Sequence, residues 1–324
     1  MNTGYTIHSI RPRSERVSGM RITEIDVRDK YHAPRYRVGR WLVHAYTGTL
    51  QRYLAGRPTM EFEHRRNVAR QLSYIPGGMK AWAGYMPGGF ATYYVHEPDH
   101  RRMVNGKKLD FITRNFFRHS YDSIGVRARL YILSWLVAEW VDEFSGDISW
   151  VSIGCGSGQP VYDVVRSLPS FVRAKATMLL VDQDEIVIEF AKKLYDHQRK
   201  ELPDVTFMTG NIVEPDFMQR VIAGKVSIVD MMGLFEYLKD DDCATVLSYI
   251  YSHLEIGGLI IFTNMSDERP HLDVHTRAIG WPGVIMRSVE SVAAIIDAAN
   301  IPAEALSAYT SRDRVYNVYR IMKL

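Results

Sequence analysis

A glycine-rich turn between a strand and a helix restricts the fold more than any other feature of this chain. Ile148–Ile153 is apolar enough for a buried strand, and a helix is predicted over 160–168. Between them, Gly154, Gly156 and Gly158 let the backbone turn sharply and pass close to a ligand. Such a turn is typical of α/β proteins that bind a nucleotide cofactor.

Strands and helices alternate through the rest of the chain. Further strands are predicted over 177–181, 205–208, 226–229, 259–264 and 315–322, and further helices over 184–197, 240–254 and 288–299. This alternation predicts a mostly parallel sheet that helices cover on both faces.

The first part of the chain has a different pattern. Residues 1–35 are polar and weakly patterned, which indicates a partly disordered segment or an arm over a partner. Apolar residues recur at helical spacing over 36–72, and an aromatic strand or loop is expected at Thr92–His96. We therefore expect two regions: a mainly helical, basic region over 1–120 and an α/β domain over 121–324.

The charge is divided unevenly between these two regions. Residues 1–120 hold 21 Lys and Arg against 9 Asp and Glu, a balance of +12, whereas residues 121–324 have a balance of −9. The basic region is expected to attract nucleic acid, a phosphorylated metabolite or the chain's own acidic part. These alternatives stay open.

Dinucleotide-binding domains use a similar turn with a different spacing. Their Gly-x-Gly-x-x-Gly pattern needs glycine or alanine at the sixth position, where the helix packs on the strand. Here the sixth residue is Gln159, and the third glycine comes one residue earlier. The spacing therefore disfavours a dehydrogenase.

The Gly-x-Gly-x-Gly sequence Gly154–Gly158 resembles the first motif of class I S-adenosylmethionine-dependent methyltransferases. The order of later elements supports the resemblance, including a sequence at 253–262 that is similar to the family's approach to strand five. The resemblance covers about residues 120–324. It implies an α/β, Rossmann-like, mostly parallel seven-stranded sheet with helices on both faces, plus a mainly helical N-terminal extension.

The resemblance also implies a set of cofactor-binding residues. Asp182, with Gln183 beside it, ends the second strand where the family binds the ribose hydroxyls, and a carboxylate can accept from both. Asn211 stands where the family usually has an Asp that accepts from the adenine amino group. The other members of the implied set are Gly154, Gly156, Gly158, Ile212, Asp230, Met231, Tyr121 and Arg127. Arg127 is expected to pair with the cofactor's carboxylate, or to be a surface arginine.

Methyl transfer needs little catalytic machinery, because positioning supplies much of the acceleration. Glu236 and Tyr237 follow the fourth strand, where they are expected to face the cofactor or substrate, or to cap and pack a helix. His271, Asp273 and His275 alternate, so an extended chain would bring all three to one side. His271 or His275 is then a candidate base, and a solvated polar loop is the alternative. No metal is expected.

Five aromatic residues lie between two Pro-Gly-Gly turns or just after the second one, and they are expected to form either aromatic core or an acceptor pocket. They are Trp82, Tyr85, Phe90, Tyr93 and Tyr94.

The sequence thus predicts an enzyme that methylates an oxygen or nitrogen of a small, partly hydrophobic molecule, as in small-molecule biosynthesis. The alternatives are an RNA methyltransferase that uses the basic region, transfer of the cofactor's aminocarboxypropyl arm, and a binding module without activity. Asp230-Met-Met-Gly differs from the Asp/Asn-Pro-Pro-Tyr/Phe motif of enzymes that methylate exocyclic base nitrogens, so nucleic acid is not the favoured substrate.

The location is expected to be cytoplasmic. The chain has two cysteines, Cys155 and Cys243, and no apolar run follows the basic residues near Met1. No membrane partner is expected, because the most apolar helical stretch, Leu130–Val141, is too short to span a bilayer. The sequence makes no prediction of oligomeric state.

Overall fold

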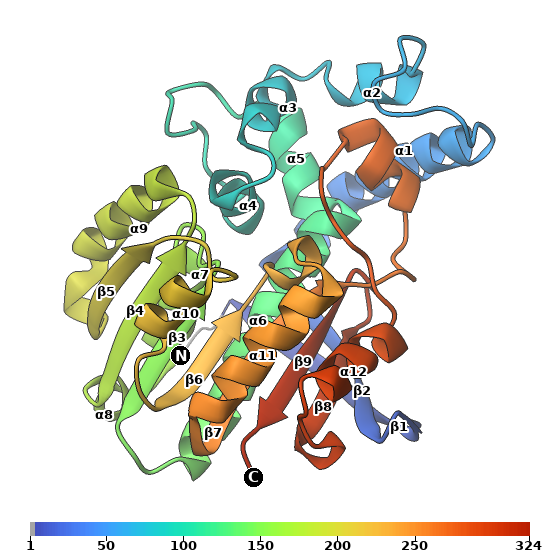
Figure 1. Ribbon diagram of the computed structural model, residues 1–324. Helices are drawn as coiled ribbons and strands as arrows, with labels where there is room; N and C mark the ends of the chain where they lie inside the picture. The colour runs from blue at the N-terminus through green and yellow to red at the C-terminus, as the bar shows by residue number, and fades with distance from the viewer. Residues whose placement is uncertain (1–3) are drawn as a thin grey trace.

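The computed structural model describes residues 4–324. These residues form one nine-stranded sheet in the order β1-β2-β8-β9-β7-β6-β3-β4-β5 (Figure 1). The strands are β1 Tyr5–Val17, β2 Met20–Asp29, β3 Ile148–Ile153, β4 Ala176–Asp182, β5 Asp204–Thr209, β6 Val226–Met231, β7 Leu254–Met265, β8 Leu306–Ser311 and β9 Tyr316–Met322.

The strands β3 to β7 are parallel to one another, and β9 runs antiparallel to β7 and to β8. Each parallel strand is joined to the next by a helical crossover, as the strand–helix alternation of the sequence predicts. The Rossmann-like α/β fold is thereby confirmed. The sheet has two more strands than the expected seven, because β1 and β2 extend its edge.

The helices of the α/β part cover both faces of the sheet. They are α6 Tyr121–Glu143, α7 Gln159–Ser167, α8 Ser170–Arg173, α9 Glu185–Gln198, η4 Arg199–Glu201, α10 Pro215–Val221, η5 Phe235–Tyr237, α11 Asp240–His253, η6 Val274–Ile279 (a short π-helix), α12 Val289–Ala298 and η7 Ala303–Ala305. The buried side chains of α10, α11 and α12 form one core with the sheet, and those of α6, α7 and α9 form another on its opposite face (Figure 1).

A helical cap, residues 30–119, lies above the end of the sheet where β3, β4 and β6 finish (Figure 1). Its elements are η1 Lys30–His32, η2 Pro34–Tyr36, α1 Arg37–Ala55, α2 Val68–Ser73, α3 Gly77–Trp82, η3 Ala83–Tyr85, α4 Gly89–His96 and α5 Phe111–His119. A third core, which includes Leu54, Tyr94 and Phe117 of the cap, continues into Val126 of α6 and Tyr316 of β9.

Two expectations about the N-terminal region need correction. Residues 5–29 are neither disordered nor helical: β1 and β2 form an antiparallel hairpin, and β2 pairs in parallel with β8. Ile25 and Val27, two positions apart in β2, are both buried in the core with α6 and α7, so alternation of apolar residues supplies the packing that a weak overall pattern concealed. Thr92–His96 belongs to the helix α4, and not to a strand or loop.

Candidate functional site

A cavity of about 320 Å³ lies between the cap and the carboxyl ends of the parallel strands. Its floor includes Gly154 and Gly156 after β3 and Asp182 at the end of β4. From β3 the chain crosses to β4 and then to β5 on one side, and the next crossover returns to β6 on the other side of β3. Ligands of open α/β sheets bind at such a reversal of strand order, so this cavity is the candidate site.

The three glycines after β3 have different surroundings. Gly154 and Gly156 line the cavity with φ values of +67° and +55°, which favour glycine. Gly158, with a φ of +70°, does not line the cavity. It faces the protein interior instead, where an added Cβ would lie 2.8 Å from the side chains of Leu180 and Tyr162. Gly158 therefore allows α7 to pack on the sheet, which corrects its expected contact with a cofactor.

The cap meets the glycine turn directly. A Cβ added to Gly89, the first residue of α4, would lie 2.8 Å from the Cα atom of Gly156. Gly88 and Gly89 both line the cavity. The second Pro-Gly-Gly turn of the sequence thus closes the cavity over the strand ends.

Asp182 presents a carboxylate to the cavity and is itself held by the backbone. Its Oδ2 accepts from the backbone N–H of Gly156 at 2.9 Å, and its Oδ1 accepts from the N–H of Asp184 at 3.1 Å. Burial raises the pKa of Asp182, while these two N–H donors act in the opposite direction. Gln183, Asn211 and Ile212 line the same part of the cavity.

Arg127 of α6 is neither at the cavity nor on the surface, the two places that the sequence offers for it. Arg127 Nε donates to Asp29 at 2.6 Å, and its Nη atoms donate to the carbonyls of Val95, Phe117 and Arg118, so it lies away from the cavity. Arg129 lines the cavity instead. Successive residues of an α-helix are about 100° apart, so positions 127 and 129 project to nearly opposite sides. Arg129 is the arginine available to a carboxylate ligand.

Arg129 pairs with one of the predicted catalytic residues. Its Nη1 lies 3.2 Å from Glu236 Oε1, and its guanidinium lies 4.3 Å from the ring centre of Tyr316. Glu236 is buried and lines the cavity; burial raises its pKa, although Arg129 opposes that shift. The pair can therefore place a positive charge on Arg129 and a proton on Glu236 at the edge of the cavity.

Tyr237 also lines the cavity, where it contacts a residue of the segment after β7. Its hydroxyl accepts from Trp281 Nε1 at 2.6 Å. Burial raises the pKa of Tyr237 above its ordinary value, so the phenol stays protonated at neutral pH.

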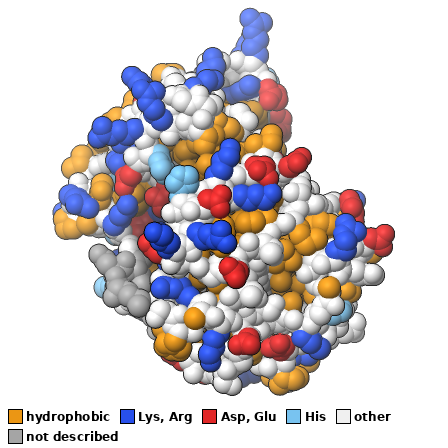
Figure 2. All heavy atoms as spheres, turned by 90° about the vertical axis from the view of Figure 1, so that its left-hand side faces the viewer, with side chains coloured by type: hydrophobic (Ala, Val, Ile, Leu, Met, Phe, Trp, Pro, Cys, Tyr) orange, Lys and Arg blue, Asp and Glu red, His pale blue; other side chains and the backbone are white. Residues whose placement is uncertain are grey.

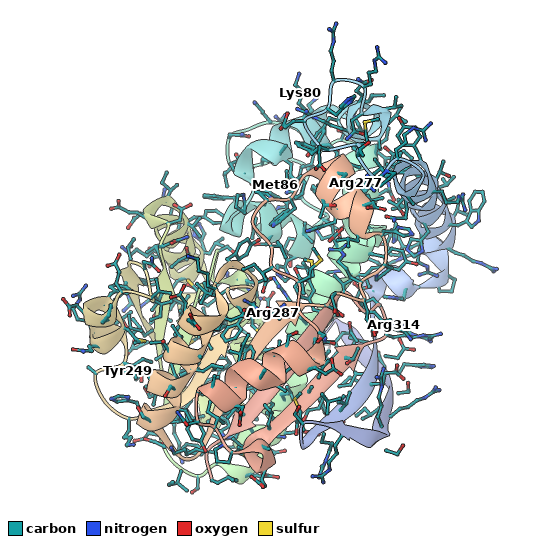
Figure 3. All side chains as sticks on the ribbon, turned by 45° about the vertical axis from the view of Figure 1, so that its right-hand side comes forward. Lys80, Met86, Tyr249, Arg277, Arg287 and Arg314 are labelled. Carbon is teal, nitrogen blue, oxygen red and sulfur yellow. The ribbon has the colours of Figure 1, made fainter. Side chains whose placement is uncertain are left out.

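The His271, Asp273 and His275 segment is not extended, and its three side chains diverge. His271 has a φ of +56° and packs against Tyr121 outside the cavity. Asp273 accepts from Gln51 at 2.6 Å and from Arg277 at 3.1 Å, where η6 meets α1 (Figure 3). His275 lies in the first turn of η6 and lines the cavity. Alternate residues share a side only in an extended chain, so the expected cluster does not form.

His275 nevertheless has a carboxylate partner, which comes from α6. Its Nδ1 lies 2.8 Å from Asp122 Oδ1, and Arg269 Nη1 lies 2.7 Å from the same oxygen. Burial would raise the pKa of Asp122, but Arg269 and His275 hold it well below its usual range. Burial lowers the pKa of His275, and Asp122 opposes that shift. The Nε2 atom of His275 has no hydrogen-bond partner among residues 4–324.

Three further predicted residues lie outside the cavity. β6 extends to Met231, so Asp230 and Met231 are buried strand residues and not part of a loop. Asp230 accepts from Trp150 Nε1 at 2.6 Å and Ser152 Oγ at 3.1 Å, which joins β6 to β3. Tyr121 stacks on His44 outside the cavity, although the next residue of α6, Asp122, lines it.

The expected cofactor roles of Asp230, Met231 and Tyr121 are corrected accordingly. Met232 and Gly233, the first residues beyond β6, line the cavity where Asp230 and Met231 were expected. The sequence predicts that this strand ends at Val229, whereas β6 ends two residues later, at Met231.

The cap contributes aromatic residues that sequence reasoning did not separate from the core. Trp82 and Phe116 line the cavity, together with Trp281. Tyr93 and Tyr94 are buried in the third core, so most of the aromatic cluster is packing. The helical spacing of α4 distinguishes the residues that face the core from those that face the cavity. This distinction could not be made from the sequence, which predicts a strand or loop at Thr92–His96.

No family model matches this chain, and no curated protein matches it either. Solved structures do resemble it. A possible exported protein from Bordetella parapertussis has a TM-score of 0.58 at 13% identity, over 87% of this chain and 96% of that one. The magnesium protoporphyrin IX methyltransferase of Synechocystis PCC 6803 with bound SAM has a TM-score of 0.49 at 12% identity, over 76% and 97%.

Only the first of these scores exceeds 0.5, and at 13% identity it establishes a likeness of fold alone. The fold class that the resemblance to class I methyltransferases implied is therefore confirmed by the sheet and its crossovers. In the described part of the chain, no helix is both long and apolar enough to span a membrane.

Proposed function

We propose that the protein transfers a methyl group from S-adenosylmethionine to an oxygen or nitrogen of a small, partly apolar molecule. One observation carries the proposal: a single cavity brings the glycine turn and Asp182 together with a histidine–carboxylate pair and aromatic cap residues. The α/β part, 121–324, would hold the cofactor, and the cap would cover the acceptor.

The residues of the cavity floor fit this cofactor. Gly154 and Gly156 leave space for a ligand beside the backbone. The Asp182 carboxylate can accept from two ribose hydroxyls, and the Asn211 amide can bind an adenine edge. Arg129 can pair with an amino acid carboxylate, a role that we transfer from Arg127. When bound, S-adenosylmethionine supplies an electrophilic methyl group on a sulfonium.

The histidine–carboxylate pair supplies a base for an acceptor that carries a proton. Asp122 beside Nδ1 of His275 favours the tautomer with a proton on Nδ1, so Nε2 is left free to accept. Nε2 would accept the acceptor's O–H or N–H proton when the acceptor's oxygen or nitrogen takes the methyl group and the sulfonium–methyl bond breaks to leave a neutral thioether. Glu236 and Tyr237 would orient the acceptor beside this base.

The acceptor side of the cavity is aromatic. Trp82 and Phe116 from the cap face the same cavity as Trp281, and the indole of Trp281 is fixed by Tyr237. Sites for small molecules combine such apolar walls with a few oriented polar groups. The lining therefore favours an acceptor with an apolar or aromatic body and one hydroxyl or amino group.

Calorimetric titration with S-adenosylmethionine and S-adenosylhomocysteine tests the cofactor assignment. Asp182→Ala should weaken binding at least about tenfold, since each lost pair of hydrogen bonds to a charged group costs about 1.4 kcal/mol or more. Asp204→Ala, which removes an exposed carboxylate from β5, is the matched control and should bind normally. Unchanged affinity in Asp182→Ala would refute the ribose assignment.

Mass spectrometry of the cofactor product tests the reaction type. Adenosylhomocysteine is expected when the protein is incubated with a mixture of small hydroxyl and amino compounds. Methylthioadenosine would instead show transfer of the aminocarboxypropyl arm, and absence of both products with bound cofactor would indicate a binding module.

A further inference from the structure

The outer face of α1 is apolar, although it faces away from every core of the molecule. Val38, Trp41, Leu42 and Tyr46 are 70%, 66%, 54% and 36% exposed. Their spacing of three and four residues places them in one stripe along the helix. The buried face of α1 is formed by other residues, including Leu50 and Leu54. Val38, Trp41 and Leu42 thus form a second, exposed apolar face of this helix, and Tyr46, whose side chain contacts Ser73 of α2, lies at its edge.

Two helices that pack against α1 also have exposed apolar side chains, and these helices are α2 and α5. Leu72 near the end of α2 and Ile75 just after it are 41% and 72% exposed, and at the start of α5, Phe111 and Ile112 are 70% and 64% exposed. We call these eight residues, on α1, on α5 and at or just after α2, the outer apolar face. Large exposed apolar groups on neighbouring elements are typical of an interaction site.

The cap that carries this face is strongly basic. Residues 30–119 hold 16 Lys and Arg against 5 Asp and Glu. Asp99 pairs with Lys30 and Arg118, and Glu63 pairs with Arg70. Several other cations have no carboxylate within ion-pair distance in the described chain: Arg35, Arg37, Arg52, Lys80, Lys107 and Lys108.

The figures show that cations also lie on other sides of the molecule. Lys and Arg side chains are prominent over the upper part of the face in Figure 2, which is the side opposite to α1 in Figure 1. Lys80 lies at the top of the cap, away from the sheet, in Figure 3. Arg37 and Arg52 lie on α1 itself, at the two ends of the stripe. Arg37 and Arg52 therefore place positive charge on the helix that carries the apolar stripe, without a carboxylate within ion-pair distance in residues 4–324, and they are free to meet an anionic partner.

We propose that the outer apolar face and its surrounding cations dock the protein on the surface of an anionic lipid bilayer. A helix that presents Trp and aliphatic side chains, flanked by arginines, is suited to the boundary between headgroups and acyl chains. Unpaired Lys and Arg near that boundary are attracted by anionic headgroups. This mode of binding needs no helix that spans the membrane.

Charge and chemistry disfavour the other occupants. A second copy of the chain would bring two basic caps together, so like charges would oppose the contact. A nucleic acid would pair with the cations but would leave Val38, Leu42, Ile75 and Ile112 without apolar partners. A bilayer satisfies both the apolar side chains and the cations.

The docking face and the cavity share a helix. Phe111 and Ile112 at the start of α5 belong to the outer face, whereas Phe116 and Phe117 farther along the same helix line the cavity. On the proposed function, an amphiphilic acceptor could pass from the bilayer to the cavity beside α5. The docking itself does not depend on that function.

Sedimentation with vesicles tests the proposal without cofactor or acceptor. Vesicles of phosphatidylcholine with about one third phosphatidylglycerol should bind the protein, and pure phosphatidylcholine should bind it at least about tenfold more weakly. Trp41→Gln with Leu42→Gln should reduce binding to the anionic vesicles about tenfold or more. Ile256→Gln, which changes a 74% exposed residue at the start of β7, is the matched control and should bind normally.

The charge contribution has its own pair of variants. Arg37→Gln with Arg52→Gln should weaken binding roughly tenfold, and added salt should weaken the wild type further. Arg199→Gln with Lys200→Gln removes the same charge from η4, outside the cap, and should have little effect. Thermal melts and S-adenosylmethionine titrations establish that each variant is folded.

Three results would overturn the proposal. The first is no sedimentation of the wild type with anionic vesicles at low salt. The second is equal loss of binding in the cap variants and their controls. The third is a dimer or a nucleic acid complex that the Trp41 and Leu42 substitutions disrupt while vesicle binding is unaffected.

Discussion

Arg127 Nε lies 2.6 Å from Asp29 Oδ2 at the point where the chain leaves the sheet for the cap. Both side chains are buried, and the same guanidinium binds carbonyl groups of α4 and α5. This arginine therefore joins the sheet, the cap and α6. The pair lowers the pKa of Asp29 well below its usual range, although burial alone would raise it.

Arg127→Met should lower the free energy of unfolding by about 3–5 kcal/mol, because it leaves the Asp29 carboxylate buried without its cation. Urea denaturation measures this loss. The double variant Arg127→Met with Asp29→Asn should recover part of it, since no unpaired charge remains. A double variant that is less stable than the single one would show that the carboxylate is not the source of the loss.

His275→Gln should lower kcat roughly 10²- to 10⁴-fold while S-adenosylmethionine affinity stays the same, because the base acts on the acceptor and not on the cofactor. Steady-state kinetics with an identified acceptor and calorimetry measure the two effects. His271→Gln is the matched control, because His271 lies outside the cavity, and it should remain active. Equal losses in the two variants would contradict the assignment.

The pH dependence of kcat should show an acid limb below the ordinary histidine pKa of about 6.5, because burial lowers the pKa of His275. Only the neutral imidazole can accept a proton, so activity falls as the pH falls through that pKa. Asp122→Asn removes the charge that raises the pKa, and the limb should move to lower pH. A limb that moves to higher pH would contradict this pairing.

Asp230→Asn should change how stability varies with pH. Burial raises the pKa of Asp230 to about 7, so the folded state holds this proton more tightly than the unfolded state. The stabilisation is complete below about pH 4 and is lost as the pH rises to about 7, on the order of 4 kcal/mol in total.

Urea denaturation between pH 4 and pH 8 measures this dependence. The difference in unfolding free energy between wild type and Asp230→Asn should shift against the wild type as the pH rises. Asp204→Asn, at an exposed position of β5, is the control. A difference that does not vary with pH would show that Asp230 is ionised throughout.

Gly89→Ala should weaken S-adenosylmethionine binding about tenfold, because the new methyl group would displace α4 from the glycine turn at Gly156. Calorimetry measures the change. Gly84→Ala in η3 adds the same methyl group where no other atom lies within 4 Å, so it should bind normally. Normal binding by Gly89→Ala would show that the cap adjusts without affecting the cofactor side.

The sequence predicted the α/β part well because its signals are local. An apolar run followed by glycines predicted β3 and the turn after it. Helical periodicity predicted α9, α11 and α12 close to their observed bounds. The hairpin of β1 and β2 was missed because its stability comes from pairing with β8, almost 300 residues away. Such pairing leaves no mark on the neighbouring sequence.

The candidate site was predicted where the backbone defines it and missed where side chains of distant segments meet. Gly154, Gly156 and Asp182 follow from strand ends, and the structure places all three at the cavity. Asp122 was missed because its partner His275 lies 153 residues later in the chain. Arg129 was missed because α6 is buried on both sides, so its sequence does not distinguish the face of Arg127 from the face of Arg129.

The pairing of β2 with β8 has a consequence for how the molecule is assembled. During synthesis the hairpin emerges long before β8, the strand with which it pairs. Until then, the buried isoleucines of β2 have no permanent cover, and the cap is attached to a sheet that does not yet exist. Maturation of this protein is thus a late, concerted event, and a nascent chain halted before β8 should be protease-sensitive throughout its cap.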